Sequence, residues 1–110
     1  MTRLAPNALR GRVVVITGAA GGLGAALARC CAQAGAQVAT LDLDGARAEA
    51  LASELRHAGH TAMGLSCDIT DRARAEAAIA AVQQQFGGID WLINNAGISA
   101  RCLLRDAAPQ

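Results

Sequence analysis

The stretch that decides the fold is Thr17-Gly18-Ala19-Ala20-Gly21-Gly22-Leu23-Gly24. It follows a β-branched run at residues 13–16 and precedes an alanine-rich stretch that extends to residue 34. A strand, a glycine-rich turn and a helix in this order present free backbone N–H groups and the positive end of a helix to a phosphate. The sequence therefore predicts a phosphate-binding turn at residues 17–24.

The composition limits the classes of protein to which this chain can belong. Its 110 residues suffice for one domain, and 53% hydrophobic with 17% charged residues is typical of a globular chain. The net charge is +1, and the only aromatic residues are Phe86 and Trp91. Without a basic stripe or a platform of aromatic side chains, we expect no nucleic-acid partner.

The location of the protein is predicted from its apolar runs and its cysteines. No run of 18 apolar residues occurs, and glycines interrupt the run that follows Arg12, so we expect neither a membrane span nor a secretion signal. The four cysteines form no C-x-x-C pair, which favours reduced thiols in a cytoplasmic protein. They are Cys30, Cys31, Cys67 and Cys102.

Short apolar runs alternate with longer amphipathic stretches along the chain. Strands are predicted at 12–17, 36–41, 62–66 and 91–93. Helices are predicted at 23–34, from an Asp44 cap to Gly59, and from a cap at Thr70 or Asp71 to Gly87. This alternation predicts an α/β fold, the N-terminal half of a Rossmann-type doubly wound parallel sheet with strand order 3-2-1-4. The domain is expected to cover 12–110, after a short polar lead-in at 1–11.

Three glycines of the turn have separate predicted tasks. Gly18 permits the tight turn, Gly22 lets the backbone approach a pyrophosphate, and Gly24 lets the helix pack closely on the sheet. The spacing T-G-x-x-x-G-x-G is longer than the strict G-x-G-x-x-G pattern, and a Walker A loop is excluded because the chain has no Lys. A glycine-rich connection without a ligand remains the alternative.

Polar side chains follow the other three predicted strands. Asp42 closes the second strand, where a carboxylate can accept hydrogen bonds from the hydroxyls of an adenosine ribose. Asp68 follows the third strand and Asn94-Asn95-Ala96-Gly97 the fourth. The alternatives are a solvated Asp42 and a helix-capping segment at Asp68. Because ligands of open α/β sheets bind at the carboxyl ends of the strands, these features predict one site.

Together, T-G-A-A-G-G-L-G, G-A-Q-V-A-T-L-D, C-D-I-T-D and N-N-A-G resemble the short-chain dehydrogenase/reductase family over about residues 9–106. The resemblance implies that the turn holds the cofactor pyrophosphate, Asp42 the ribose, Asp68 and Ile69 the adenine, and Asn95 the region near the adenosine ribose. Gly97 would line the path to the nicotinamide, and Asn94 would brace the sheet. The implied cofactor-binding residues are Gly18, Gly21, Gly22, Leu23, Gly24, Asp42, Asp68, Ile69, Asn95 and Gly97.

The catalytic residues of that family cannot be carried over. They are a Ser, a Tyr-x-x-x-Lys pair and an Asn, and this chain contains neither Tyr nor Lys. Ser99 follows N-N-A-G too closely to match the family's Ser, and we interpret it as a loop hydroxyl. We therefore expect no catalytic residue here and a domain truncated after its fourth strand. His57 and His60 lack a third ligand, so no metal site is expected.

The resemblance implies an NAD-dependent oxidoreductase that moves a hydride between a nicotinamide cofactor and an alcohol or carbonyl substrate. The full-length form is expected to be a homo-oligomer, and this chain its inactive cofactor-binding fragment. The alternative is a non-catalytic NAD-binding module or an inactive truncated gene product. NAD is expected over NADP, because Asp42 repels a 2′-phosphate and Leu43 stands where NADP-preferring relatives often carry Arg. Arg47 lies one helical turn further on, and we expect little contribution from it.

Overall fold

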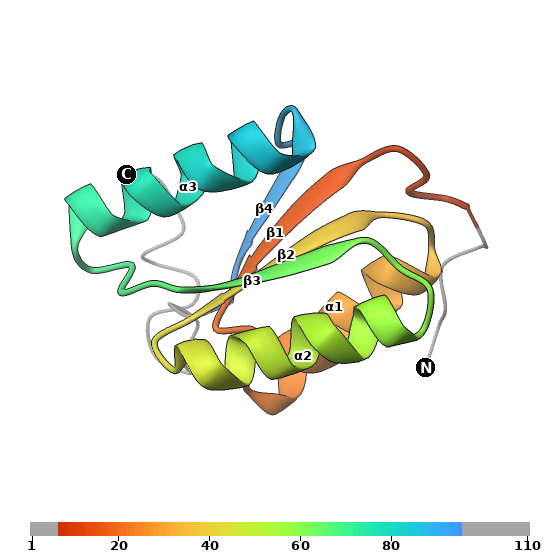
Figure 1. Ribbon diagram of the computed structural model, residues 1–110, viewed down its shortest axis with the longest axis horizontal. Helices are drawn as coiled ribbons and strands as arrows, with labels where there is room; N and C mark the ends of the chain where they lie inside the picture. Colours follow the sequence, from red (N-terminus) through yellow and green to blue (C-terminus); the bar gives the residue numbers. More distant parts are fainter. Residues whose placement is uncertain (1–6, 96–110) are drawn as a thin grey trace, which may run out of the picture.

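The computed structural model describes residues 7–95, in which strands and helices alternate along the chain (Figure 1). The elements are β1 (Val13–Thr17), α1 (Gly22–Gln33), β2 (Gln37–Asp42), α2 (Gly45–His57), β3 (Ala62–Ser66), α3 (Arg72–Phe86) and β4 (Trp91–Asn94). The predicted order of elements is confirmed, with bounds that differ by a residue or two. Asp42 is the last residue of β2, as predicted.

The four strands form one parallel sheet in the order β3-β2-β1-β4. At the end of β1, Thr17 lies opposite Leu41 of β2 and Asn94 of β4, and at the end of β2 Asp42 lies opposite Ser66. The carboxyl ends of all four strands therefore meet at one edge. This arrangement confirms the predicted 3-2-1-4 order of a Rossmann-type fold.

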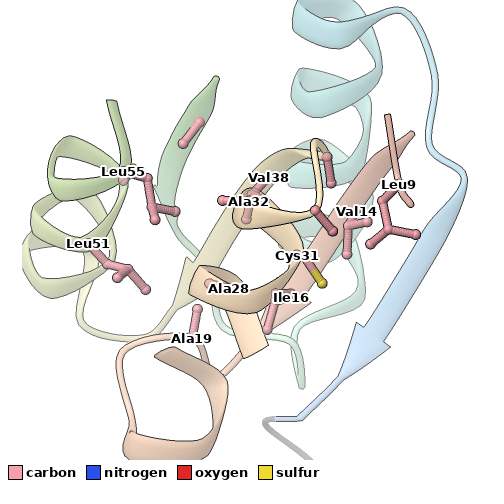
Figure 2. Close-up of a cluster of buried hydrophobic side chains, with 14 residues drawn as sticks. Leu9, Val14, Ile16, Ala19, Ala28, Cys31, Ala32, Val38, Leu51 and Leu55 are labelled. Atoms are coloured by element: carbon pink, nitrogen blue, oxygen red, sulfur yellow. The ribbon is translucent and has the colours of Figure 1, made fainter. Parts of the chain in front are cut away.

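Helices cover both faces of the sheet, with α1 and α2 on one side and α3 on the other (Figure 1). The side chains of β1 alternate between these layers. Val14 and Ile16 enter the cluster beneath α1 and α2, shown in Figure 2, whereas Val13 and Val15 enter the cluster beneath α3. A strand that is buried on both faces requires a continuous apolar run, which explains why β1 shows no alternation in its sequence.

Capping residues in the sequence set the first residues of α2 and α3 and the last residue of α3. The Asp44 carboxylate accepts a hydrogen bond from the Arg47 N–H at 3.1 Å and so caps α2. The Asp71 carboxylate accepts from the Arg74 N–H at 3.1 Å, so Asp71 rather than Thr70 caps α3. At the other end of α3, Gly87 adopts φ of 87°, a left-handed conformation that glycine tolerates best.

Part of the expected lead-in belongs to the core. Leu9 is only 5% exposed, packs in the cluster beneath α1 and α2, and donates its N–H to the Ala34 carbonyl at 2.8 Å (Figure 2). This contact ties the start of the described chain to the end of α1. The prediction of a polar lead-in at residues 1–11 is therefore wrong for Leu9, which is part of the core.

The described cysteines are free thiols, and two of them are buried. Burial raises the pKa of the Cys31 thiol and that of the Cys67 thiol, which lowers the reactivity of both side chains. Cys102 lies outside the described residues. The buried pair therefore contributes to packing as small apolar side chains.

The β4 strand forms one edge of the sheet within residues 7–95. It pairs with β1 on one side, and Trp91 and Leu92 remain 49% and 56% exposed. An exposed apolar strand edge is a template for pairing with further chain segments. Among the described helices, none has the length and apolar character needed to span a membrane.

Candidate functional site

The predicted site residues gather at the carboxyl edge of the sheet. The glycine turn follows β1, Asp42 ends β2, Asp68 and Ile69 follow β3, and Asn95 follows β4. Gly97, the residue predicted to lie toward the nicotinamide, is outside the described residues. The remaining nine predicted positions all lie on the turn and strand ends of this edge, as expected for a ligand site in an open α/β sheet.

The geometry of the turn explains two of its glycines without any ligand. Gly18 has φ of 64°, in the left-handed region. A Cβ on Gly24 would overlap the Gly18 carbonyl and lie 2.8 Å from the Ala19 Cα. The close approach of Gly24 is therefore to the turn itself, in addition to any packing of α1 on the sheet.

Gly22 has a different environment. A Cβ on Gly22 would meet no protein atom within 4 Å among the described residues, and the φ of Gly22 is not positive. Protein packing therefore gives no steric reason for glycine here. A bare backbone that faces open space is what the close approach of a pyrophosphate requires.

The N-terminus of α1 begins at this turn. Gly21 is the N-cap and provides no side-chain hydrogen bond, and the first turn of α1 has no acidic residue. The first helical bond runs from the Ala25 N–H to the Gly21 carbonyl at 2.8 Å, so within residues 7–95 no acceptor binds the N–H groups of Gly22, Leu23 and Gly24. Such uncapped N–H groups, at the positive end of a helix dipole, are suited to an anion.

The carboxylate of Asp42 is fixed by two backbone groups. Its Oδ2 atom accepts from the Ala20 N–H at 3.0 Å, and its Oδ1 atom accepts from the Asp44 N–H at 2.9 Å. A third bond, from the Ala19 N–H to the Leu41 carbonyl at 3.1 Å, joins the turn to β2. The Asp42 carboxylate is therefore oriented before any ligand arrives, and each of its oxygens keeps a second lone pair for a hydroxyl.

The end of β4 is joined to the same turn. The Asn95 Nδ2 group donates to the Gly18 carbonyl at 3.1 Å, and the Thr17 hydroxyl donates to the Asn94 Oδ1 atom at 2.9 Å. The contact of Asn94 with β1 fits its predicted role as a brace of the sheet. Asn95 holds the turn as well, a function that the sequence alone did not indicate.

Asp68 has a local structural role. Its Oδ1 atom accepts from the Thr70 hydroxyl at 2.6 Å and from the Thr70 N–H at 3.0 Å, and these bonds hold the pKa of Asp68 below its ordinary value. They close the turn that leads into α3, as the capping alternative expected. Contact of Asp68 with adenine stays a prediction.

A mainly apolar cavity of about 150 Å³ opens between α3 and the carboxyl edge of the sheet. This cavity has no signal in the sequence, because its walls come from separate strands, from α3 and from the segment between β3 and α3. It places apolar surface beside Ile69, one of the predicted adenine contacts. The lining residues are Thr17, Leu41, Cys67, Ile69, Ala75, Ile79, Leu92 and Asn94.

Comparison with known proteins decides the family. The profile described as short chain dehydrogenase matches residues 12–110, which include every element of the sheet. The chain belongs to the short chain dehydrogenase family. It is similar to D-threitol dehydrogenase of Mycolicibacterium smegmatis, with 45% identity over 83% of this chain and 35% of that protein. Galactitol 2-dehydrogenase of Agrobacterium fabrum is 43% identical over 82% of this chain and 34% of its own length.

The fold of this chain is also found among solved structures. The crystal structure of hydroxysteroid dehydrogenase from Escherichia coli superimposes with a TM-score of 0.79 and 34% identity, covering 83% of this chain and 37% of that one. The chain thus spans little more than a third of the length of these relatives.

The side chain of Arg47 contacts the glycine turn. Whether Arg47 helps to bind a 2′-phosphate stays a prediction. Its position in α2 is as expected, but its side chain turns back, and the Nη2 group donates to the Ala20 carbonyl at 3.0 Å. A positive charge therefore stands at the turn, separated from the Asp42 carboxylate by the backbone of one residue.

The two histidines lie far from this edge in the fold, at the end of α2 and after it. The His57 Nδ1 atom lies 2.8 Å from the Ser53 carbonyl, within its own helix. No group of three potential ligands that could hold a metal ion occurs in the part of the chain that the structure describes.

Proposed function

We propose that this chain provides the cofactor-binding part of an NAD-dependent short-chain dehydrogenase/reductase. The complete protein would transfer a hydride between the nicotinamide and an alcohol or carbonyl carbon. The observation that carries the proposal is that the uncapped N-terminus of α1 and the fixed Asp42 carboxylate both adjoin the glycine turn. A dinucleotide needs both features, one for its pyrophosphate and one for its adenosine ribose.

Each group of the cofactor has candidate partners at this edge. The N–H groups of Gly22, Leu23 and Gly24 would bind the pyrophosphate, and the second lone pairs of Asp42 would accept from the ribose hydroxyls. Further proposed contacts come from Gly18 and Gly21 to the pyrophosphate, Asp68 and Ile69 to the adenine, Asn95 near the ribose and Gly97 toward the nicotinamide.

We favour NAD over NADP because of how Asp42 is held. Two backbone N–H groups bind the Asp42 carboxylate and hold its negative charge beside the glycine turn. The carboxylate therefore stays where it repels a 2′-phosphate. The next residue, Leu43, is 72% exposed and uncharged. Neither residue offers a cation to a 2′-phosphate.

The substrate class follows from relatives. Two of them are named as dehydrogenases of threitol and galactitol, so we propose a small alcohol or carbonyl substrate. A homo-oligomeric full-length protein stays a prediction from the sequence. The 110 residues contain neither Tyr nor Lys, so the acid–base groups of the family are not among them. For the same reason, a non-catalytic NAD-binding module or an inactive truncated gene product is the second candidate. A cytoplasmic location stays a prediction from the sequence.

Titration of the chain with NADH tests the proposal. Gly22→Val places a side chain in the open space at the start of α1, and Gly88→Val is the matched control, since a Cβ at either glycine meets no described atom and neither has a positive φ. We expect NADH binding that weakens at least about tenfold in Gly22→Val, the loss of about 1.4 kcal/mol, and is unchanged in Gly88→Val. Absence of binding by the unmodified chain, or equal binding by both variants, would contradict the proposal.

A further inference from the structure

Arg47 lines a recess between α1 and α2, and no acidic side chain of the described residues neutralises its positive charge there. The recess has a volume of about 210 Å³, and its walls include Ala20, Arg29, Arg47 and Glu54. Arg29 is neutralised, because its Nε and Nη2 groups bind the Glu54 carboxylate at 2.7 and 3.0 Å. Arg47 forms no ion pair within residues 7–95, and its one side-chain bond goes to the Ala20 carbonyl.

The position of Arg47 in its helix does not explain its presence. It lies in the first turn of α2, where the helix dipole disfavours a positive charge. The cap of α2 comes from Asp44, whose carboxylate accepts the backbone N–H of Arg47 and makes no use of the guanidinium. The guanidinium therefore has its only described contact at the glycine turn.

The two backbone groups of Ala20 bind side chains of opposite charge. Its N–H donates to Asp42, and its carbonyl accepts from Arg47. A ribose that binds the Asp42 carboxylate thus has a cation close by, on the side that opens into the recess. Asp42 is fixed by two bonds, whereas the exposed Arg47 has a long side chain and further N–H donors to offer a phosphate.

We propose that Arg47 is a specificity-determining residue that partly offsets the exclusion of a 2′-phosphate by Asp42. The inference rests on the proposed function, since it concerns the same nucleotide site. The site would then prefer NAD and still accept NADP, because the repulsion from Asp42 is opposed by an attraction of similar range. Removal of Arg47 would sharpen the preference for NAD.

The test compares NADH with NADPH, which differ only in the 2′-phosphate. The dissociation constants of both are measured by fluorescence titration for the 110-residue chain and for Arg47→Ala, Arg47→Lys and Arg72→Ala. Arg72 is a matched control, because it is also an exposed arginine in the first turn of a helix, α3. Circular dichroism verifies that each variant is folded.

We expect Arg47→Ala to weaken NADPH binding about five- to tenfold while NADH binding changes less than about twofold. Arg47→Lys should retain most of the NADPH affinity, and Arg72→Ala should leave both affinities unchanged. Equal weakening of NADH and NADPH binding would mean that Arg47 only holds the turn. Unchanged dissociation constants for both cofactors would mean that Arg47 has no part in binding. Either result overturns the inference. An unmodified chain that binds neither cofactor would contradict the proposed function itself.

Discussion

Replacement of Asp42 should reverse the choice between NAD and NADP. We consider Asp42→Ala combined with Leu43→Arg, which removes the fixed carboxylate and adds a cation at the next, exposed position. The variant loses the acceptor for the ribose hydroxyls and the repulsion of a 2′-phosphate in one step. Ala20 and Asp44 keep N–H groups that water can reach, so the turn should still form.

The size of the effect follows from two contributions. A 2′-phosphate of about two negative charges, held about 5 Å from a carboxylate in water, is repelled by about 2 kcal/mol. Loss of a ribose hydrogen bond to the charged acceptor Asp42 costs NAD about 1.5 kcal/mol. Together these terms, about 3.5 kcal/mol, shift the ratio of the two affinities by about three hundredfold toward NADP. The cation that Leu43→Arg introduces increases the shift further.

The assay is a parallel titration of the unmodified chain and the double variant with NADH and NADPH. Leu43→Arg alone separates the added cation from the removed carboxylate, and urea unfolding reports whether the turn survives. An unmodified chain that binds NADPH more tightly than NADH would refute the assigned role of Asp42. So would a double variant whose preference is unchanged.

Four further predictions concern the chain itself. The purified chain should show no NADH-linked turnover of alcohols, because it has neither Tyr nor Lys; turnover above background would refute this. The exposed edge at β4 should cause self-association, and Trp91→Lys should reduce the light scattering. Gly24→Ala should lower the free energy of unfolding by about 2 kcal/mol, because its Cβ overlaps the turn, and Gly22→Ala should not. The hydrogen bond from Arg29 lowers the pKa of Glu54 from 4.5. The stabilisation of the fold by this ion pair is therefore present above pH 4.5 and is lost as pH falls through the lowered value. In acid, the free energy of urea unfolding of Glu54→Gln should approach that of the unmodified chain.

The sheet and its carboxyl edge could be predicted from sequence because local rules determine them. Continuous β-branched residues at 13–16 require burial on both faces, and parallel strands bring their carboxyl ends together. Gly18 was predicted to make the tight turn, and its φ of 64° confirms that conformation. These inferences need only spacing and residue type.

The corner formed by Ala20, Asp42 and Arg47 could not be predicted in the same way. The reach of Arg47 back to the turn depends on its rotamer and on the angle between α2 and the sheet, neither of which appears in a periodic pattern. The burial of Leu9 depends on where α1 ends relative to the first strand. Both contacts join segments distant in sequence through single side chains, and a single sequence contains no signal for them.

Amide chemical shifts test most directly whether the start of α1 holds a cofactor pyrophosphate. NADH is added to the ¹⁵N-labelled chain, and the backbone N–H signals are followed through the titration. We predict that the largest shifts occur at Gly22, Leu23 and Gly24, whose N–H groups have no acceptor in the described structure. Shifts absent at these three residues, with NADH bound elsewhere or not at all, would contradict the account.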